Sequence, residues 1–153
     1  MNETDLCYTP ATELVDAIRA KKLSAVEATS AVLNRITRLE PRLNAFAYLA
    51  AEEAMDAAEA ADRALAKGEP IGPLHGVPVT IKDNILVRGL RATWGSRLYT
   101  DYVPEFDEEP VARLRHVGAV ILGKTNVPEY TLHGFTDNEL FGPTRNPWDL
   151  ALT

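Results

Sequence analysis

The pattern of apolar and polar positions predicts three helices in the first 68 residues. The first follows Thr9-Pro10, with the threonine as N-cap and the proline at the first helical position, where a missing N–H costs nothing. The second begins at the capping box 24–27 and ends at Pro41. The third is Ala-rich, covers about 50–67 and ends at Gly68. The apolar face expected on the second helix is Val26, Val32, Leu33, Ile36 and Leu39.

Short β-branched runs replace the helical pattern from Glu69 onward. Residues 77–81 predict a strand, with Pro78 at its start or at a sheet edge. A short helix over 109–116 leads through a glycine into 119–122, a wholly apolar run that predicts a buried strand. This order of helix, glycine and apolar strand is typical of α/β layers.

We therefore expect an α/β fold in two parts. A helical prelude covers 1–68, and the start of an α/β core covers 69–153. The chain ends in a loop-rich stretch that carries Trp148 and two leucines, without a capping helix or polar tail. This ending predicts a truncated chain. Trp94 and Trp148 are both expected in the core.

Charge and composition exclude several classes of partner. The net charge is −6, from 16 Lys and Arg against 22 Asp and Glu, and no basic run is present. A nucleic-acid interface needs clustered Lys and Arg, so none is expected. The chain has no apolar run of membrane-spanning length and no signal-peptide pattern. Cys7 is the only cysteine, which excludes an internal disulfide. We expect a cytoplasmic protein without a membrane partner.

Two features of the sequence, a glycine-lysine pattern and the histidines, resemble cofactor sites, but neither has the surroundings that such a site needs. Residues 118–125 fit G-x-x-x-x-G-K-[ST]. A phosphate loop needs a flexible loop between the glycines and a helix after the lysine, whereas here the intervening residues predict a strand and Pro128 interrupts a helix. The histidines have no metal-ligand spacing and are expected in loops or at the surface: His75, His116 and His133. No nucleotide, metal or other cofactor is expected.

Lys82 directly follows the predicted strand over 77–81 and precedes Asp83-Asn84. Taken alone, a lysine in this place is more often a surface residue than a functional one. If its head group were buried, desolvation would lower the pKa of the amine, and a neutral lysine can act as a base toward a hydroxyl. Adjacent strand residues face opposite sides of a sheet, so Asp83 need not pair with Lys82.

Three blocks resemble the amidase signature family, in that family's order. Residues 72–84, GPLHGVPVTIKDN, are similar to its G-P-L-H-G-[IV]-P-x-x-[IV]-K-D-N block. Residues 118–129, GAVILGKTNVPE, are similar to G-A-[IV]-x-x-G-K-T-N-x-x-E, and 141–149 to F-G-P-T-R-N-P-W-[DN]. The helical prelude also matches at 43–46, LNAF. Because the matches extend along nearly the whole chain, it is identified as a member of the family.

The resemblance implies an α/β/α fold, with a mixed sheet flanked by helices, and a Ser–cis-Ser–Lys triad that hydrolyses amide bonds. Lys82 takes the position of the family's catalytic lysine. Both serines belong to family segments that would follow Thr153, so this chain alone is expected to be inactive and to need the C-terminal remainder of its own chain. The remaining candidates are Asp83, Asn84 and Gly76 as structural supports and Asn126 and Val127 as pocket residues.

Three functions stay open. The first is hydrolysis of a small-molecule amide. The second is the amide-cleaving subunit of a glutamyl-tRNA(Gln) or aspartyl-tRNA(Asn) amidotransferase, which resembles the chain through the same blocks but typically has G-K-T-N-M-D-E-F where this chain has VPEY at 127–130. That difference favours hydrolysis. The third is a non-catalytic, partner-binding remnant, for which the acidic charge and the Ala-rich helix would suffice. The amphipathic prelude is also compatible with a homodimer.

Overall fold

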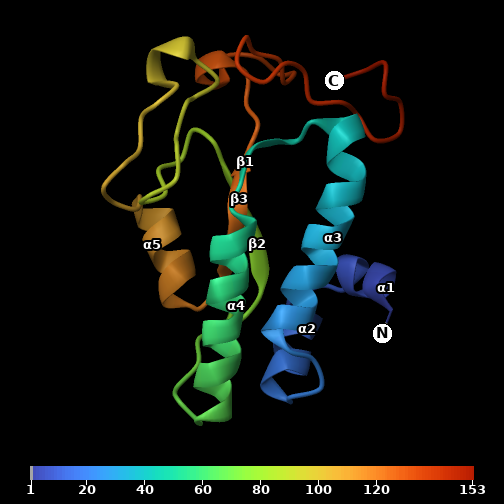
Figure 1. Ribbon diagram of the computed structural model, residues 1–153, viewed down its shortest axis with the longest axis vertical. Helices are drawn as coiled ribbons and strands as arrows, with labels where there is room; N and C mark the ends of the chain where they lie inside the picture. Colours follow the sequence, from blue (N-terminus) through green and yellow to red (C-terminus); the bar gives the residue numbers. More distant parts are fainter. Residues whose placement is uncertain (1) are drawn as a thin grey trace. The chain divides into compact units, whose positions relative to one another are not determined.

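A computed structural model describes residues 2–153, and it is an α/β structure with a small mixed sheet (Figure 1). The elements in chain order are α1 Glu3–Tyr8, α2 Ala11–Arg19, α3 Ala25–Leu43, β1 Phe46–Leu49, α4 Ala51–Ala66, β2 Pro78–Lys82, α5 Glu109–His116 and β3 Val120–Thr125. Two short 3-10 helices, Arg97–Tyr99 and Glu129–Thr131, lie in the loops. The predicted fold class is confirmed, and α4, α5 and β2 lie within one or two residues of their predicted positions.

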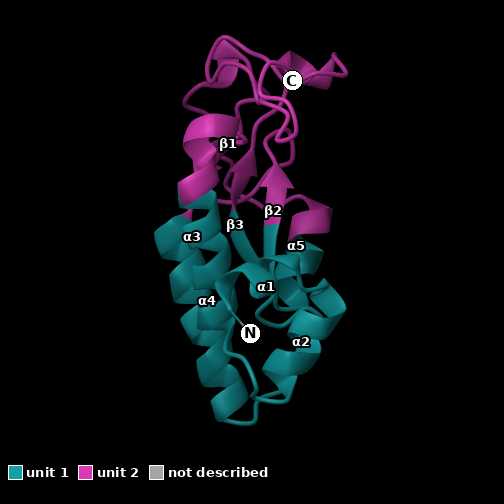
Figure 2. Cartoon of the chain, turned by 90° about the vertical axis from the view of Figure 1, so that its right-hand side faces the viewer, with its two compact units in different colours: residues 1–37, 51–79, 112–122 teal, residues 38–50, 80–111, 123–153 magenta. Residues whose placement is uncertain are grey.

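The chain forms two compact units, coloured separately in Figure 2. Unit 1 comprises residues 1–37, 51–79 and 112–122. Unit 2 comprises residues 38–50, 80–111 and 123–153. Each unit takes residues from both sides of Gly68. The division into a prelude over 1–68 and a core over 69–153 describes the order of elements along the chain and stays a prediction.

The start of the first predicted helix is wrong. Thr9 is the C-cap of α1, and Pro10 is the N-cap of α2 instead of its first helical residue. Helix α1 was not predicted, because six residues are too few to show a helical period. Its own capping box joins Asn2 and Asp5. The buried residues of α2 are Leu14, Val15 and Ile18, which recur at helical spacing.

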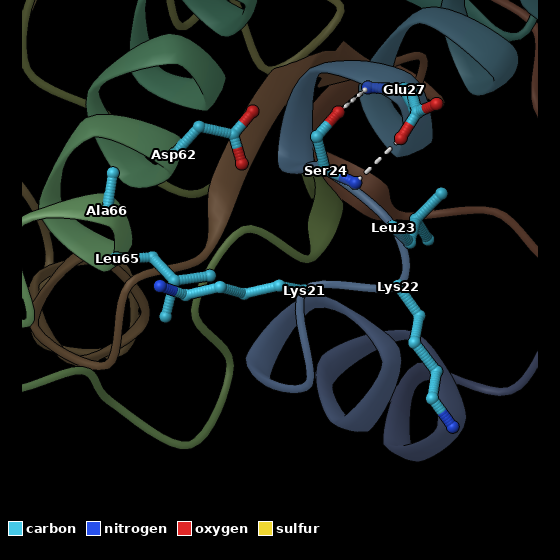
Figure 3. Close-up of a pocket in the computed structure, with 8 residues that line it drawn as sticks. All are labelled: Lys21, Lys22, Leu23, Ser24, Glu27, Asp62, Leu65 and Ala66. Carbon is cyan, nitrogen blue, oxygen red and sulfur yellow. Dashed lines mark hydrogen bonds between the residues drawn. The ribbon is translucent and has the colours of Figure 1, made fainter.

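The predicted capping box of α3 is confirmed. The Ser24 N–H donates to the Glu27 carboxylate at 2.8 Å, and the Glu27 N–H donates to the Ser24 hydroxyl at 2.9 Å (Figure 3). The Ser24 backbone bond, followed by its hydroxyl, holds the pKa of Glu27 below its usual value. Asp62 from α4 adds a second cap, accepting from the N–H groups of Ala25 at 2.8 Å and Val26 at 3.1 Å.

Of the predicted apolar face of α3, Leu33 is buried, whereas Val26, Val32, Ile36 and Leu39 are only half-buried. Small side chains are buried instead: Ala25, Ala28, Thr29 and Ala31. The reason lies in α4, which buries Ala54, Ala58 and Ala61. Asp62 contacts the start of α3 and Met55 contacts its Ser30, so the two helices run antiparallel and pack through small residues. Pro41 also lies inside α3, which ends two residues later at Leu43.

Thr29 has a fully buried hydroxyl without a hydrogen-bond partner in the described chain. We expect Thr29→Val to raise the free energy of unfolding by up to about 1 kcal/mol, because the buried hydroxyl loses its hydration without gaining a bond. Urea unfolding of the 153-residue chain at 25 °C measures it. Thr37→Val is the matched control, since the Thr37 hydroxyl donates to Leu33 O at 3.0 Å. A lower midpoint for Thr29→Val than for the control would contradict the prediction.

The strands pair in the order β1-β3-β2. The Val120 N–H donates to Val77 O, and the Asp83 N–H donates to Thr125 O, so β2 and β3 are parallel. β1 is antiparallel to β3. The mixed sheet and the edge position of Pro78 are therefore confirmed. β1 was not predicted, because four half-buried residues show no alternation.

Candidate functional site

Lys82 is the last residue of β2 and is exposed. Its carbonyl oxygen accepts the N–H of Ile85 at 3.0 Å, which closes a turn directly after the strand. The side chain makes no hydrogen bond or ion pair within residues 2–153. A lysine therefore lies at the strand end, as expected, and its side chain is exposed and available to contact other groups.

Asp83 points the other way and is 1 % exposed. One carboxylate oxygen accepts from the Thr93 N–H at 3.0 Å and from the Thr93 hydroxyl at 2.6 Å. Its backbone N–H donates to Thr125 O at 3.0 Å. Asp83 therefore connects the end of β2 to the end of β3 and to the loop that contains Thr93. It forms no ion pair with Lys82.

Lys124 is the partner of Asp83, and the sequence analysis missed it. Its side chain is fully buried, and its Nζ lies 3.4 Å from Asp83 Oδ1, 3.3 Å from Asp83 O and 3.2 Å from Arg91 O. Burial lowers the pKa of Lys124, and the Asp83 carboxylate partly opposes that effect. The available signal was a lysine inside an apolar strand. Lys124 lies within the phosphate-loop-like pattern of 118–125, whose residues 120–125 form the strand β3.

Asn84 follows in the turn and is half-buried. Its side-chain carbonyl oxygen is shielded from solvent and has no hydrogen-bond partner among the described residues. Buried acceptors are normally paired, so this oxygen marks Asn84 as a group able to accept a further donor.

Asn126 and Val127 follow β3. The Asn126 amide donates to Gly142 O at 3.0 Å and to the Thr144 hydroxyl at 3.1 Å. Its oxygen accepts from the Val127 N–H at 2.9 Å and from Asn138 at 2.8 Å. All four hydrogen-bonding positions of the Asn126 side chain are in use. With Val127 fully buried, both residues organise the loops after β3.

Gly76 belongs to unit 1, in the loop before β2. Its φ is +75°, and a Cβ there would lie 2.7 Å from the Cβ of Ala25. Its N–H donates to Gly118 O at 2.9 Å. His75 beside it lies in the same loop, as expected, but it is buried, and its Nε2 lies 2.9 Å from Ala61 O. The close approach of two backbones requires a glycine at position 76.

The two tryptophans differ from the expected core positions. Trp148 is 91 % exposed, so its assignment to the core is wrong for this structure. Trp94 is half-buried, with its ring 5.0 Å from that of Tyr99 and 5.9 Å from that of Tyr102. Trp148 lies in the loops beyond β3, where no element of the described chain covers it.

A hollow of about 330 Å³ lies in unit 1, among the ends of helices (Figure 3). It is lined by Lys21, Lys22, Leu23, Ser24, Glu27, Asp62, Leu65 and Ala66. Three of its polar residues, Ser24, Glu27 and Asp62, are engaged in capping α3, and it contains none of the candidate site residues. In residues 2–153, no group of three or more His, Cys, Asp or Glu side chains is arranged to hold a metal, and none of the helices combines the length and apolar character of a membrane span.

Residues 27–153 match the family described as Amidase. The chain belongs to the amidase family. It is 45 % identical over 146 residues to a glutamyl-tRNA(Gln) amidotransferase chain, the A subunit, of Moorella thermoacetica. That match covers 95 % of this chain and 30 % of the relative, so the chain spans about a third of the length of such curated relatives.

Solved amidase structures share the fold. A fatty acid amide hydrolase superposes with a TM-score of 0.93 at 29 % identity, over 97 % of this chain and 26 % of that one. A bacterial aryl acylamidase of the amidase signature enzymes superposes with a TM-score of 0.87 at 35 % identity, over 93 % of this chain and 30 % of that one. At the level of the family, these neighbours support cleavage of amide bonds.

Proposed function

We propose that this chain is part of an amidohydrolase that cleaves a linear amide C–N bond of a small molecule, with Lys82 as its base. The observation that carries the proposal is the arrangement at the end of β2. Lys82 is exposed, whereas the adjacent Asp83 is buried and paired with Lys124. An amine without a carboxylate partner is available to a serine hydroxyl, whose proton a base must take.

The proposed mechanism uses two serines that the family resemblance assigns to further sequence. Neutral Lys82 takes a proton from the bridging serine, which takes one from the nucleophilic serine as that oxygen attacks the amide carbon. Backbone N–H groups stabilise the tetrahedral oxyanion. The C–N bond then breaks, the proton returns to the leaving amine, and water releases the carboxylate from the acyl-enzyme. The serines of this chain do not match the family's serine motifs: Ser24, Ser30 and Ser96.

We propose supporting roles for the other candidate residues. Asp83 and Asn84 hold the strand end, Gly76 shapes the loop before β2, and the buried Asn126 and Val127 hold the backbone of the loops that would border the substrate pocket. We further propose that residues 69–153 begin the catalytic core and that the remainder of the protein is the principal partner of this chain. The protein is proposed to act in the cytoplasm. The helices of 1–68 are proposed to be available for a homodimer.

A second candidate is the amide-cleaving subunit of a tRNA-dependent amidotransferase. The specific observation that favours it is the 45 % identity to the Moorella thermoacetica amidotransferase chain, against 29 % and 35 % to the two amidases. The departure at 127–130 from the M-D-E-F usual in such chains favours the hydrolase. Both candidates use the same base to break an amide bond, so Lys82 has the same role in each.

A fluorophosphonate probe, which reacts with activated serines, tests the proposed function. We expect the protein produced from its complete coding sequence to be labelled and to hydrolyse small amides without partners. We expect the 153-residue chain to remain unlabelled, because its serines do not match the motifs. Absence of labelling in the complete protein would favour a non-catalytic remnant. Conversion of glutamyl-tRNA(Gln) that requires companion proteins, without hydrolysis of small amides, would favour the amidotransferase.

A further inference from the structure

Lys124 and Asp83 form a buried ion pair directly beside Lys82, and both partners are at most 1 % exposed. Such a pair stabilises a fold little more than apolar side chains of the same size, because desolvation offsets the attraction. Its best-attested use is to specify one arrangement out of several. Asp83, one partner of this buried pair, is the residue next to Lys82 in the chain. The pair can therefore influence both the position and the charge state of Lys82.

The first part of that role is geometric. The three N–H groups of the Lys124 ammonium have three acceptors within 3.4 Å, namely Asp83 Oδ1, Asp83 O and Arg91 O. Asp83 is thereby held through its side chain and its carbonyl group, while its N–H is held by Thr125 O at 3.0 Å. Since Lys82 precedes Asp83 and its own carbonyl closes a turn with Ile85, the direction of its side chain from β2 is determined by these bonds.

The second part is electrostatic. Asp83 is the carboxylate adjacent to Lys82 in sequence, and an ionised carboxylate nearby favours the ammonium form of an amine. The Lys124 charge compensates that carboxylate at 3.4 Å. As a result, the interior of the site presents no net charge from this pair to Lys82.

Other charged groups lie in the surrounding segments, and the charge of Glu108 also favours the ammonium form of Lys124. The Glu108 carboxylate accepts the Leu86 N–H at 3.0 Å, and that of Asp107 accepts the Arg88 N–H at 2.8 Å. The Arg91 guanidinium lies 5.9 Å from the centroid of the Tyr48 ring. The Asp83–Lys124 pair is the charge pair directly next to Lys82 in the chain.

We propose that Lys124 is a positioning residue for Lys82: its buried ammonium neutralises Asp83 and ties down its carbonyl group, so that Lys82 leaves β2 in one direction and without a counter-ion. The inference rests on the proposed function of Lys82 as a base. Its electrostatic part is measurable on the 153-residue chain itself, independently of any catalytic activity.

The experiment follows acetylation of Lys82 by trace acetic anhydride as a function of pH, with the modified peptide quantified by mass spectrometry. Lys124→Gln removes the positive charge but keeps an N–H donor, and we expect it to raise the midpoint of the Lys82 titration by about 0.5 to 1 pH unit. Asp83→Asn removes the carboxylate that keeps the buried Lys124 protonated, so Lys124 loses its charge as well and we expect the Lys82 midpoint to stay near that of the wild type. The double variant removes both charges and is expected to return the midpoint to that of the wild type.

Lys67→Met is the matched control, because Lys67 is an exposed lysine in unit 1, and its loss is expected to leave the Lys82 titration unchanged. Circular dichroism tests whether each variant is folded. A variant that does not fold is replaced by Lys124→Arg, which keeps the positive charge. Its expected midpoint is that of the wild type. An unchanged midpoint in Lys124→Gln, or a rise of similar size in Asp83→Asn, would overturn the inference, because a general loosening of the fold would not depend on which of the two charges is removed.

The complete protein separates this inference from the proposed function. There we expect the acidic limb of the kcat/KM profile to move in the same direction as the Lys82 titration in each variant. Hydrolysis that survives removal of the Lys82 amine overturns the proposed function, whatever the titrations show. Hydrolysis that depends on Lys82, with a titration unaffected by Lys124→Gln, overturns only the role of Lys124.

Discussion

Replacement of Lys82 by methionine is expected to lower kcat/KM for a small amide by about 1,000-fold or more in the protein produced from its complete coding sequence. A positioned general base contributes roughly 10²- to 10⁴-fold, and groups that act as a unit lose nearly all activity when one is removed. Because Lys82 is exposed, we expect the unfolding midpoint to remain within error of the wild type. Steady-state hydrolysis of an amide with a chromogenic amine measures the effect.

Lys82→Arg distinguishes a base from a mere positive charge. Arginine keeps the charge but does not lose its proton at ordinary pH, so we expect it to be as inactive as methionine. Lys67→Met provides the control for loss of a surface lysine. Retention of more than about a tenth of the wild-type kcat/KM by Lys82→Met would exclude Lys82 as the base in this reaction.

Gly123→Ala is expected to destabilise the 153-residue chain by about 3 kcal/mol or more. Gly123 lies in β3 with a φ of +148°, which residues with a Cβ rarely adopt. An added Cβ would lie 2.3 Å from Tyr48 O and 3.0 Å from Leu49 Cα. Both contacts are backbone atoms of the paired strand β1, so the clash cannot be relieved by rotation of a side chain.

Two other glycines separate the effect of backbone strain on stability from the effect of the steric clash. Gly134 has no positive φ and open space around it, so Gly134→Ala is expected to be nearly neutral. Gly89 has a φ of +82° with open space, so Gly89→Ala is expected to cost about 1 kcal/mol from backbone strain alone. Urea unfolding followed by circular dichroism measures all three. Equal midpoints for Gly123→Ala and Gly134→Ala would contradict the close approach of β1 and β3.

Much of the fold was predictable because it depends on neighbours in the chain. The capping box at Ser24, the extent of α4, the bounds of α5 and the strand that ends at Lys82 all follow from hydrogen bonds and side-chain periods within a few residues. The motif blocks likewise located Lys82, Asp83 and Asn84 together. The short elements α1 and β1 escaped prediction because six and four residues do not establish a period.

The sequence by itself thus determined the fold class, the family and the position of Lys82 at a strand end. Only the tertiary structure decided which side chains are buried. The face of α3 is made of alanines because α4 approaches it closely, and Trp148 is exposed because no described element packs over it. The ion pair of Asp83 and Lys124 joins residues 41 positions apart, and no local pattern states which lysine such a carboxylate meets. Burial and long-range charge pairing depend on how elements pack, which local propensity does not contain.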